Sequence, residues 1–139
     1  MKIKKLIIKF VMFFFVMFSF TACNFAPKEM VGRYNLTEIK GIPGVSVNTY
    51  EYNYIELKSD LTYHLENKAF NQITAQDGTW TYDKSTQELT FICHVNESTY
   101  SKDIATYNPE AKTFTLKSTV ETYSVSFTFT LEVTPEAQA

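Results

Sequence analysis

Cysteine, histidine, arginine and tryptophan are all scarce in this chain. Its 139 residues include two cysteines, two histidines, one tryptophan and a single arginine, Arg33. A protein zinc site needs three or four converging ligands, and no cysteine or histidine spacing here supplies them. We therefore expect no metal site.

The chain also lacks the motifs of the common enzyme and nucleic-acid-binding classes. It has no glycine-rich phosphate loop, no nucleophile elbow and no paired-histidine zinc motif. Acidic residues stand singly, not as a carboxylate pair that could serve as acid and base. We expect neither catalysis nor a cofactor, and we assign no catalytic residue. Beyond the first ten residues there is no basic cluster, which argues against a nucleic-acid partner.

A basic and then apolar stretch opens the chain. Lysines at positions 2, 4, 5 and 9 precede an apolar run from Phe10 to Phe20. A charged segment, a short apolar segment and small residues before a cleavage point are typical of a secretory signal peptide. The run is shorter than the roughly 20 apolar residues of a membrane-spanning helix. We predict a signal peptide over residues 1–22.

The junction that follows resembles the lipobox of bacterial lipoproteins. It reads Phe20-Thr21-Ala22-Cys23, with Phe20 where leucine is usual. The resemblance implies cleavage before Cys23 and lipid (diacylglyceryl and palmitate) on that cysteine, so the product is exported and anchored to the bacterial membrane, facing the outside or the periplasm. The mature chain carries nine basic and fifteen acidic residues, so the acyl chains must supply the attachment. Cys93 is then left without a disulfide partner, and we expect it to pack as a small buried hydrophobe, a reactive thiol being the alternative.

Beyond residue 30 the composition is typical of a β-sheet. Glycine and proline are few, while threonine, tyrosine, phenylalanine and valine abound. The clearest strand alternates six apolar residues with small polar ones from Tyr123 to Val133. Shorter strands are predicted at 33–39, 50–58, 61–66, 79–82, 88–95, 99–107 and 113–116. Residues 67–77 stay open between a short strand and a mobile loop.

About eight strands joined by short hairpins favour an all-β, up-and-down antiparallel meander barrel, with a β-sandwich as the alternative. We predict a lipidated tether at 23–30, the barrel domain at 31–134 and a C-terminal tail at 135–139, in a monomer. Six aromatic residues are expected to fill much of the barrel interior. They are Phe70, Trp80, Phe91, Phe114, Phe127 and Phe129.

Two short motifs resemble those of lipocalins. Gly32-Arg33-Tyr34 opens the first predicted strand, and Gly78-Thr79-Trp80 opens a central one. They are similar to the Gly-x-Trp signature of lipocalin-like domains of secreted bacterial lipoproteins, with Tyr34 in place of the first tryptophan. The resemblance covers residues 31–133 and implies a closed barrel that binds a small apolar or amphipathic molecule.

A run of alternating tyrosines supplies the candidate ligand-binding residues. Tyr50, Tyr52 and Tyr54 would form a wall inside a barrel, together with Trp80. The alternative is an ordinary strand that exposes these aromatics to solvent or to a partner. Apolar residues change sides after Tyr54, so we expect a β-bulge between Tyr54 and Ile55.

Two functions follow from these observations. The first is an anchored, lipocalin-like carrier of a small hydrophobic ligand. The second is a non-catalytic interaction or structural module of the cell envelope, with a solid core and with residues 41–48 and 67–77 as contact segments. The interior volume of the barrel separates the two.

Overall fold

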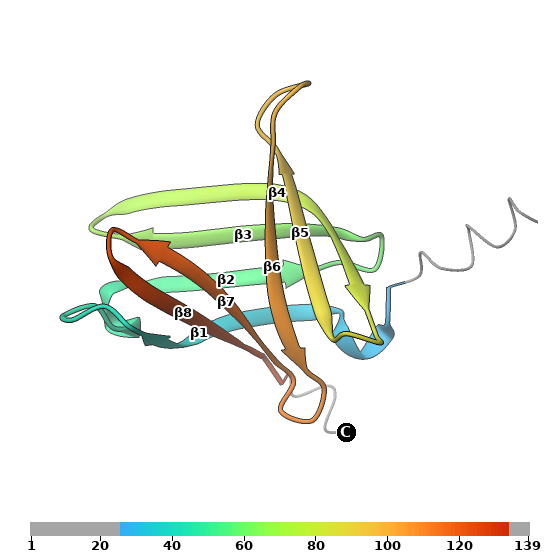
Figure 1. The fold of residues 1–139 in the computed structure, drawn as a ribbon, viewed down its shortest axis with the longest axis horizontal. Helices are drawn as coiled ribbons and strands as arrows, with labels where there is room; N and C mark the ends of the chain where they lie inside the picture. The colour runs from blue at the N-terminus through green and yellow to red at the C-terminus, as the bar shows by residue number, and fades with distance from the viewer. Residues whose placement is uncertain (1–25, 134–139) are drawn as a thin grey trace, which may run out of the picture.

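The computed structural model describes residues 26–133, so the predicted signal peptide, the lipidation site at Cys23 and the tail at 135–139 lie outside the described residues. Eight strands make up most of the described chain (Figure 1). They are β1 (Gly32–Lys40), β2 (Tyr52–Leu57), β3 (Thr62–Ala69), β4 (Gln72–Asp83), β5 (Glu88–His94), β6 (Tyr100–Asn108), β7 (Thr113–Val120) and β8 (Tyr123–Leu131). Two 3-10 turns, η1 (Lys28–Met30) and η2 (Val47–Thr49), accompany them. Neither is a helix that could cross a membrane, and residues 26–133 contain no other candidate.

Each strand pairs antiparallel with the next one in sequence, and β8 returns to pair with β1. The result is a closed eight-stranded barrel in meander order, which confirms the fold predicted from the strand pattern. Turn residues with positive φ, such as Asn71 and Gln87, allow the short reversals. Closure pairs the first strand with the last and so removes a pair of exposed sheet edges.

The up-and-down order gives the barrel two distinct ends. We call one the plugged end: it carries η1 and the turns at 58–61, 84–87 and 109–112. The other, the distal end, carries the loop at 41–51 and the turns at 70–71, 95–99 and 121–122. The described chain begins at the plugged end, where η1 leads into β1.

Aromatic side chains fill the plugged half of the barrel. Phe114 lies at their centre, with its ring centroid 5.0 Å from that of Tyr34, 5.5 Å from Phe91 and 5.1 Å from Phe129. Trp80 is fully buried, and its Nε1 donates a hydrogen bond to the Lys58 carbonyl at 3.1 Å. Aromatic rings bury a large apolar area, and the stability of a small domain with a single core depends on that area.

The segment before β1 belongs to this core. Met30 is buried, and the Tyr34 hydroxyl donates a hydrogen bond to its carbonyl oxygen at 2.8 Å. Burial raises the pKa of Tyr34 above its usual range. The last residues of the predicted tether at 23–30 thus form the turn η1. This turn helps to close the plugged end, because it places the apolar Met30 side chain in the core there.

Residues 67–77, which the sequence left undecided, form the β3–β4 hairpin. Lys68 pairs with Ile73, and Phe70 and Asn71 make the turn. Phe70 is 85% exposed, so its predicted place in the interior is wrong. Its position at the hairpin tip carries it past the last strand pair, beyond the reach of the core.

The packing predicts a sharp difference between two phenylalanines. Phe114→Ala removes the ring at the centre of the aromatic cluster, and we expect it to lower the free energy of unfolding by about 3–5 kcal/mol. Phe70→Ala, at the exposed hairpin tip, should change it by less than about 0.5 kcal/mol. Urea unfolding followed by Trp80 fluorescence measures both. Equal effects of the two substitutions would contradict the described core.

Candidate functional site

The barrel interior becomes more polar toward the distal end. Asn53, Asn67 and Thr74 share the inward face with Ile55, which is buried. At mid-height, Gln76 Nε2 donates a hydrogen bond to the Tyr63 hydroxyl at 2.7 Å. Asn53 Oδ1 is buried without a hydrogen-bond partner among the described residues. The two halves of the interior therefore differ in chemistry: the plugged half is apolar, and the distal half is lined with amide side chains.

A small cavity lies where these two halves meet. Its volume is about 30 Å³. The lining residues are Ile55, Tyr63, Leu65, Gln76, Phe91, Asp103 and Leu116. Such a cavity holds a water molecule or two, whereas pockets for small organic ligands measure roughly 300–1,000 Å³. In this conformation the cavity has no room for a fatty acid or a retinoid.

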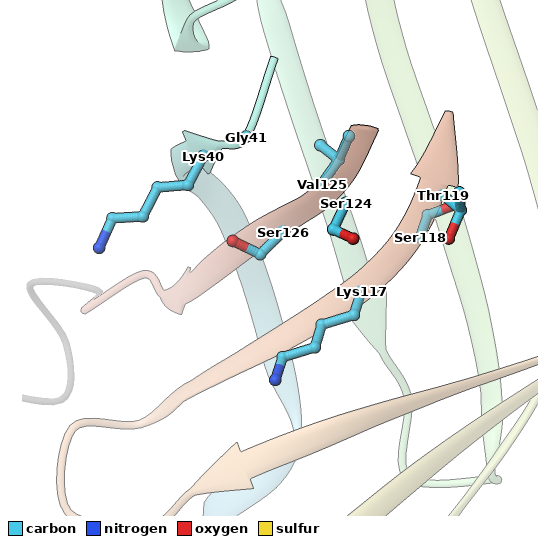
Figure 2. A pocket seen from close by; sticks show the side chains of 8 residues that line it. All are labelled: Lys40, Gly41, Lys117, Ser118, Thr119, Ser124, Val125 and Ser126. Atoms are coloured by element: carbon cyan, nitrogen blue, oxygen red, sulfur yellow. The ribbon is translucent and has the colours of Figure 1, made fainter. Parts of the chain in front are cut away.

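A much larger hollow lies outside the core, where β1, β7 and β8 meet near the distal end (Figure 2). We call it the β7–β8 groove, and it is open and about 620 Å³ in volume. It is lined by Lys40, Gly41, Lys117, Ser118, Thr119, Ser124, Val125 and Ser126. Its walls therefore combine two ammonium groups with a floor of hydroxyls.

The register explains how the groove is built. Ser126 pairs with Lys40 on one side and with Lys117 on the other, so the three side chains form one row across the sheet. Figure 2 shows both lysines extending from this row in the same direction. Lys40 forms an ion pair with Glu38 at 3.1 Å, whereas Lys117 forms none with any other residue of the range 26–133. Hydroxyls beside a cation can accept and donate hydrogen bonds to a polar or anionic partner.

The tyrosine ladder lies on the outside of the barrel. Tyr52 and Tyr54 alternate with the inward-facing residues of β2, and their ring centroids are 6.1 Å apart. The Arg33 guanidinium lies 4.0 Å from the Tyr54 ring centroid, a cation–π contact. Tyr50 lies before β2 and packs partly against the core. These three tyrosines do not form one wall, and Trp80 lies in the plugged half, away from Tyr52 and Tyr54.

No bulge interrupts β2. Its register runs without a shift from Tyr52 to Leu57 against β3, so the predicted bulge between Tyr54 and Ile55 is wrong. The change of sides in the sequence has another cause: Asn53, a polar residue, occupies an inward position in the distal half of the interior, where it pairs with Asn67. Of the two alternatives for Tyr52 and Tyr54, the structure favours the ordinary strand, with both tyrosines half-buried on its outer face.

The outer face of β3 and β4 carries a small charged cluster. His64 Nδ1 lies 2.8 Å from Asp77 Oδ1, and His64 Nε2 lies 3.6 Å from Glu66 Oε1. The hydrogen bond to Asp77, with a further contribution from Glu66, raises the pKa of His64 above 6.5. In the part of the chain that the structure describes, no group of three or more potential ligands is arranged to hold a metal ion.

Several features of the site were not predicted from the sequence. The β7–β8 groove depends on the pairing of Ser126 with both Lys117 and Lys40, and Lys40, which lies 86 positions from Ser126, becomes its neighbour only through barrel closure. The serine and threonine stripe of the last strand was visible in the sequence, but not the two lysines beside it. Cys93 is only partly buried, on the inward face of β5.

The comparisons with known proteins add no family. The chain matches no protein-family model, and it matches none of the curated proteins.

The His64 cluster predicts a pH dependence with a definite sign. Because its folded-state pKa is raised, the cluster stabilises the fold fully below the unfolded pKa, and this contribution is lost as the pH rises through the folded pKa. His64→Gln should therefore lower the free energy of unfolding at acid pH, by at most about 1 kcal/mol because Asp77 is well exposed. The difference from the wild type should shrink toward about pH 8.

The control for this prediction keeps the histidine and removes its main partner. Asp77→Asn should abolish most of the pH dependence while His64 remains in place. Urea unfolding of the three proteins between about pH 5 and pH 8 provides the comparison. A His64→Gln difference that grows with pH would contradict the described pair.

Proposed function

We propose that this protein is a lipid-anchored component of the bacterial cell envelope whose barrel is a non-catalytic binding module for a protein partner. The observation that carries the proposal is the small interior cavity of about 30 Å³ set against an exposed groove of about 620 Å³. A carrier of the lipocalin kind needs its space inside the barrel. This barrel offers its larger hollow outside the core.

The leader and Cys23 support membrane attachment. Ala26 packs partly against the core at the plugged end. Ala26 follows Cys23 by three positions, and an extended chain spans at most about 3.6 Å per position. A lipid on Cys23 would hold the plugged end within about 11 Å of the bilayer surface. The distal end would then face away from the membrane, toward other envelope components.

Exposed apolar side chains at the distal end support contact with a partner. Phe70 and Val95 lie at the tips of two hairpins and are 85% and 69% exposed. Ile73, Tyr100, Val120 and Tyr123 are also exposed and lie beside those tips or at the β7–β8 turn. Apolar residues gathered at one end of a soluble domain mark interaction surfaces more often than scattered ones do.

Several acidic side chains have structural roles, which supports a non-catalytic function. Asp60 accepts a hydrogen bond from the Thr62 backbone, and Asp83 accepts one from the Ser85 backbone. Hydrogen bonds from the Thr62 and Ser85 hydroxyls, together with these backbone hydrogen bonds, lower the pKa of both carboxyl groups. Carboxylates that stabilise tight turns in the ionised form are poor proton donors near neutral pH.

The filled interior predicts the outcome of a ligand screen. Titration with a fluorescent fatty acid and a retinoid-like probe should give no saturable binding, because neither fits the cavity. Leu116→Trp, which places a larger side chain on the cavity wall, serves as the control and should leave the signal unchanged. Saturable one-to-one binding that Leu116→Trp abolishes would favour the carrier function instead.

Membrane attachment predicts a change in cell fractionation. The wild-type chain, expressed in bacteria, should be found with the membranes, and mass spectrometry should show acyl groups on Cys23. Cys23→Ser should move the protein to the soluble fraction, because it removes the acceptor of the lipid. Cys93→Ser is the matched control and should stay with the membranes. An unmodified wild-type N-terminus would disprove the anchoring.

A further inference from the structure

The pairing between β6 and β7 stops about halfway along the two strands. β6 and β7 pair through only four positions at the plugged end, from Asn108↔Thr113 to Ala105↔Leu116. Beyond them, residues 100–104 of β6 pair with β5 alone, and residues 117–120 of β7 pair with β8 alone. Figure 1 shows the β5–β6 hairpin diverging from the β7–β8 hairpin. We call this opening the β6–β7 fork.

The fork leaves backbone groups free on both edges. Tyr107 donates its backbone N–H to the Gln87 carbonyl on the β5 side. Because backbone groups of a strand alternate in direction, those of Tyr100 and Lys102 point toward β7. Leu131 donates to the Lys112 carbonyl, so by the same alternation the groups of Thr119 point toward β6. Unpaired edges of this kind are templates for an added strand.

A comparable opening elsewhere in the barrel is covered by the chain itself. β1 and β2 also pair over only four positions, from Gly32↔Leu57 to Asn35↔Tyr54. There η2 contacts β1, and Val47 and Tyr50 pack against the core. No described segment covers the β6–β7 fork in this way, and its edges carry Tyr100, Ile104 and Val120 at 60%, 49% and 43% exposure.

The charges beside the fork indicate the chemistry of its occupant. Lys102 on β6 and Lys117 on β7 lie on the outer face, one on each edge, and neither forms an ion pair within residues 26–133. On the inner side of the fork, β7 contributes Leu116 and Val120, and β6 contributes Ser101 and Asp103. Apolar side chains of an added strand can pack against the two β7 residues, whereas an inward carboxylate would be repelled by Asp103. The β7–β8 groove continues from this edge, since Lys117, Ser118 and Thr119 line it.

We propose that the β6–β7 fork binds an extended segment of a partner protein by strand addition. The segment alternates acidic residues, which face Lys102 and Lys117, with apolar residues, which face the barrel interior. This deepens the proposed function and rests on it, because it names the class of partner that the distal end takes. Main-chain hydrogen bonds supply affinity in this mode, and the alternating side chains supply specificity.

A second copy of the chain fits the fork less well. In antiparallel self-pairing of β6 about a two-fold axis, the register that pairs the whole free edge places Lys102 directly opposite its own copy. Like charges in that position are destabilising. A separate segment with carboxylates outward meets the same lysine with a favourable charge.

The test measures binding of a defined peptide to the full chain, purified from whichever cell fraction contains it. The probe is a fluorescein-labelled octapeptide of alternating glutamate and valine, followed by fluorescence anisotropy. We expect saturable binding, and binding at least about tenfold weaker to a lysine–valine peptide of the same pattern. Absence of saturable binding by the glutamate–valine peptide would overturn the proposal.

Two further measurements separate backbone pairing from charge attraction. Lys102→Pro removes the free N–H on the β6 edge, where proline is tolerated. Lys102→Gln removes only the charge. Both should weaken binding, with an additional loss of up to about tenfold for the proline. Equal affinities of the two variants would contradict strand addition. In case the proline variant fails to fold, N-methylation of alternate peptide bonds in the probe tests the same point on the wild-type protein, and one alternating set should abolish binding while the other does not.

Other occupants would give distinct results. A dimer of the wild-type chain that Lys102→Pro converts to a monomer would identify a second copy as the occupant and overturn the proposal. So would tighter peptide binding by a chain that ends at residue 133, since the chain's own tail would then be the competitor. Failure of the peptide experiment leaves the anchoring and the filled interior untouched. Saturable fatty-acid binding would instead overturn the proposed function itself.

Discussion

The structure depends on the packing of aromatic rings inside the plugged half of the barrel. Tyr34, Phe91, Phe114 and Phe129 come from four different strands and meet within ring distances of 5.0–5.5 Å. Eight strands enclose just enough space for such side chains to fill. Because these rings occupy the plugged half, they hold the strands together there. The turn η1, with its buried Met30, closes this end of the barrel.

The distal half lacks this constraint. Its inward positions carry Asn53, Asn67 and Thr74, which contribute less apolar burial than the rings below. There the barrel loses pairing at two places, between β1 and β2 and between β6 and β7. One opening is filled by η2 and Tyr50, and the other has no cover among residues 26–133. A core that closes one end while leaving the other less tightly joined gives the molecule a fixed base and an unpaired strand edge.

The alternation of apolar and polar residues was sufficient to favour the meander barrel and to locate most of its strands, although β4 begins at Gln72 and not near residue 79. β8 begins at the predicted residue, Tyr123, because both faces of the strand have a consistent pattern. The β3–β4 hairpin could not be decided from the sequence, since Phe70 and Ile73 lie at a tip where exposure, not burial, is the outcome. The bulge predicted after Tyr54 is absent for a related reason. Asn53 faces inward, but a polar residue in an alternating pattern is normally assigned to the outer face.

The proposed binding surface was less predictable than the fold. The β6–β7 fork follows from where pairing stops, and nothing in the local sequence of 100–104 marks that point, because those residues still form a regular ladder with β5. The β7–β8 groove likewise requires the closure that brings Lys40 beside Ser126. Long-range register, not local propensity, determines both features.

Amide hydrogen exchange, resolved by residue in two-dimensional NMR, tests this division of the barrel most directly. The account predicts slow exchange for the backbone N–H groups of Thr106 and Tyr107, which lie in the paired part of β6, and fast exchange for those of Lys102 and Thr119 at the fork. Protection of Lys102 and Thr119 equal to that of Thr106 would contradict it, because β6 and β7 would then be paired along their full length.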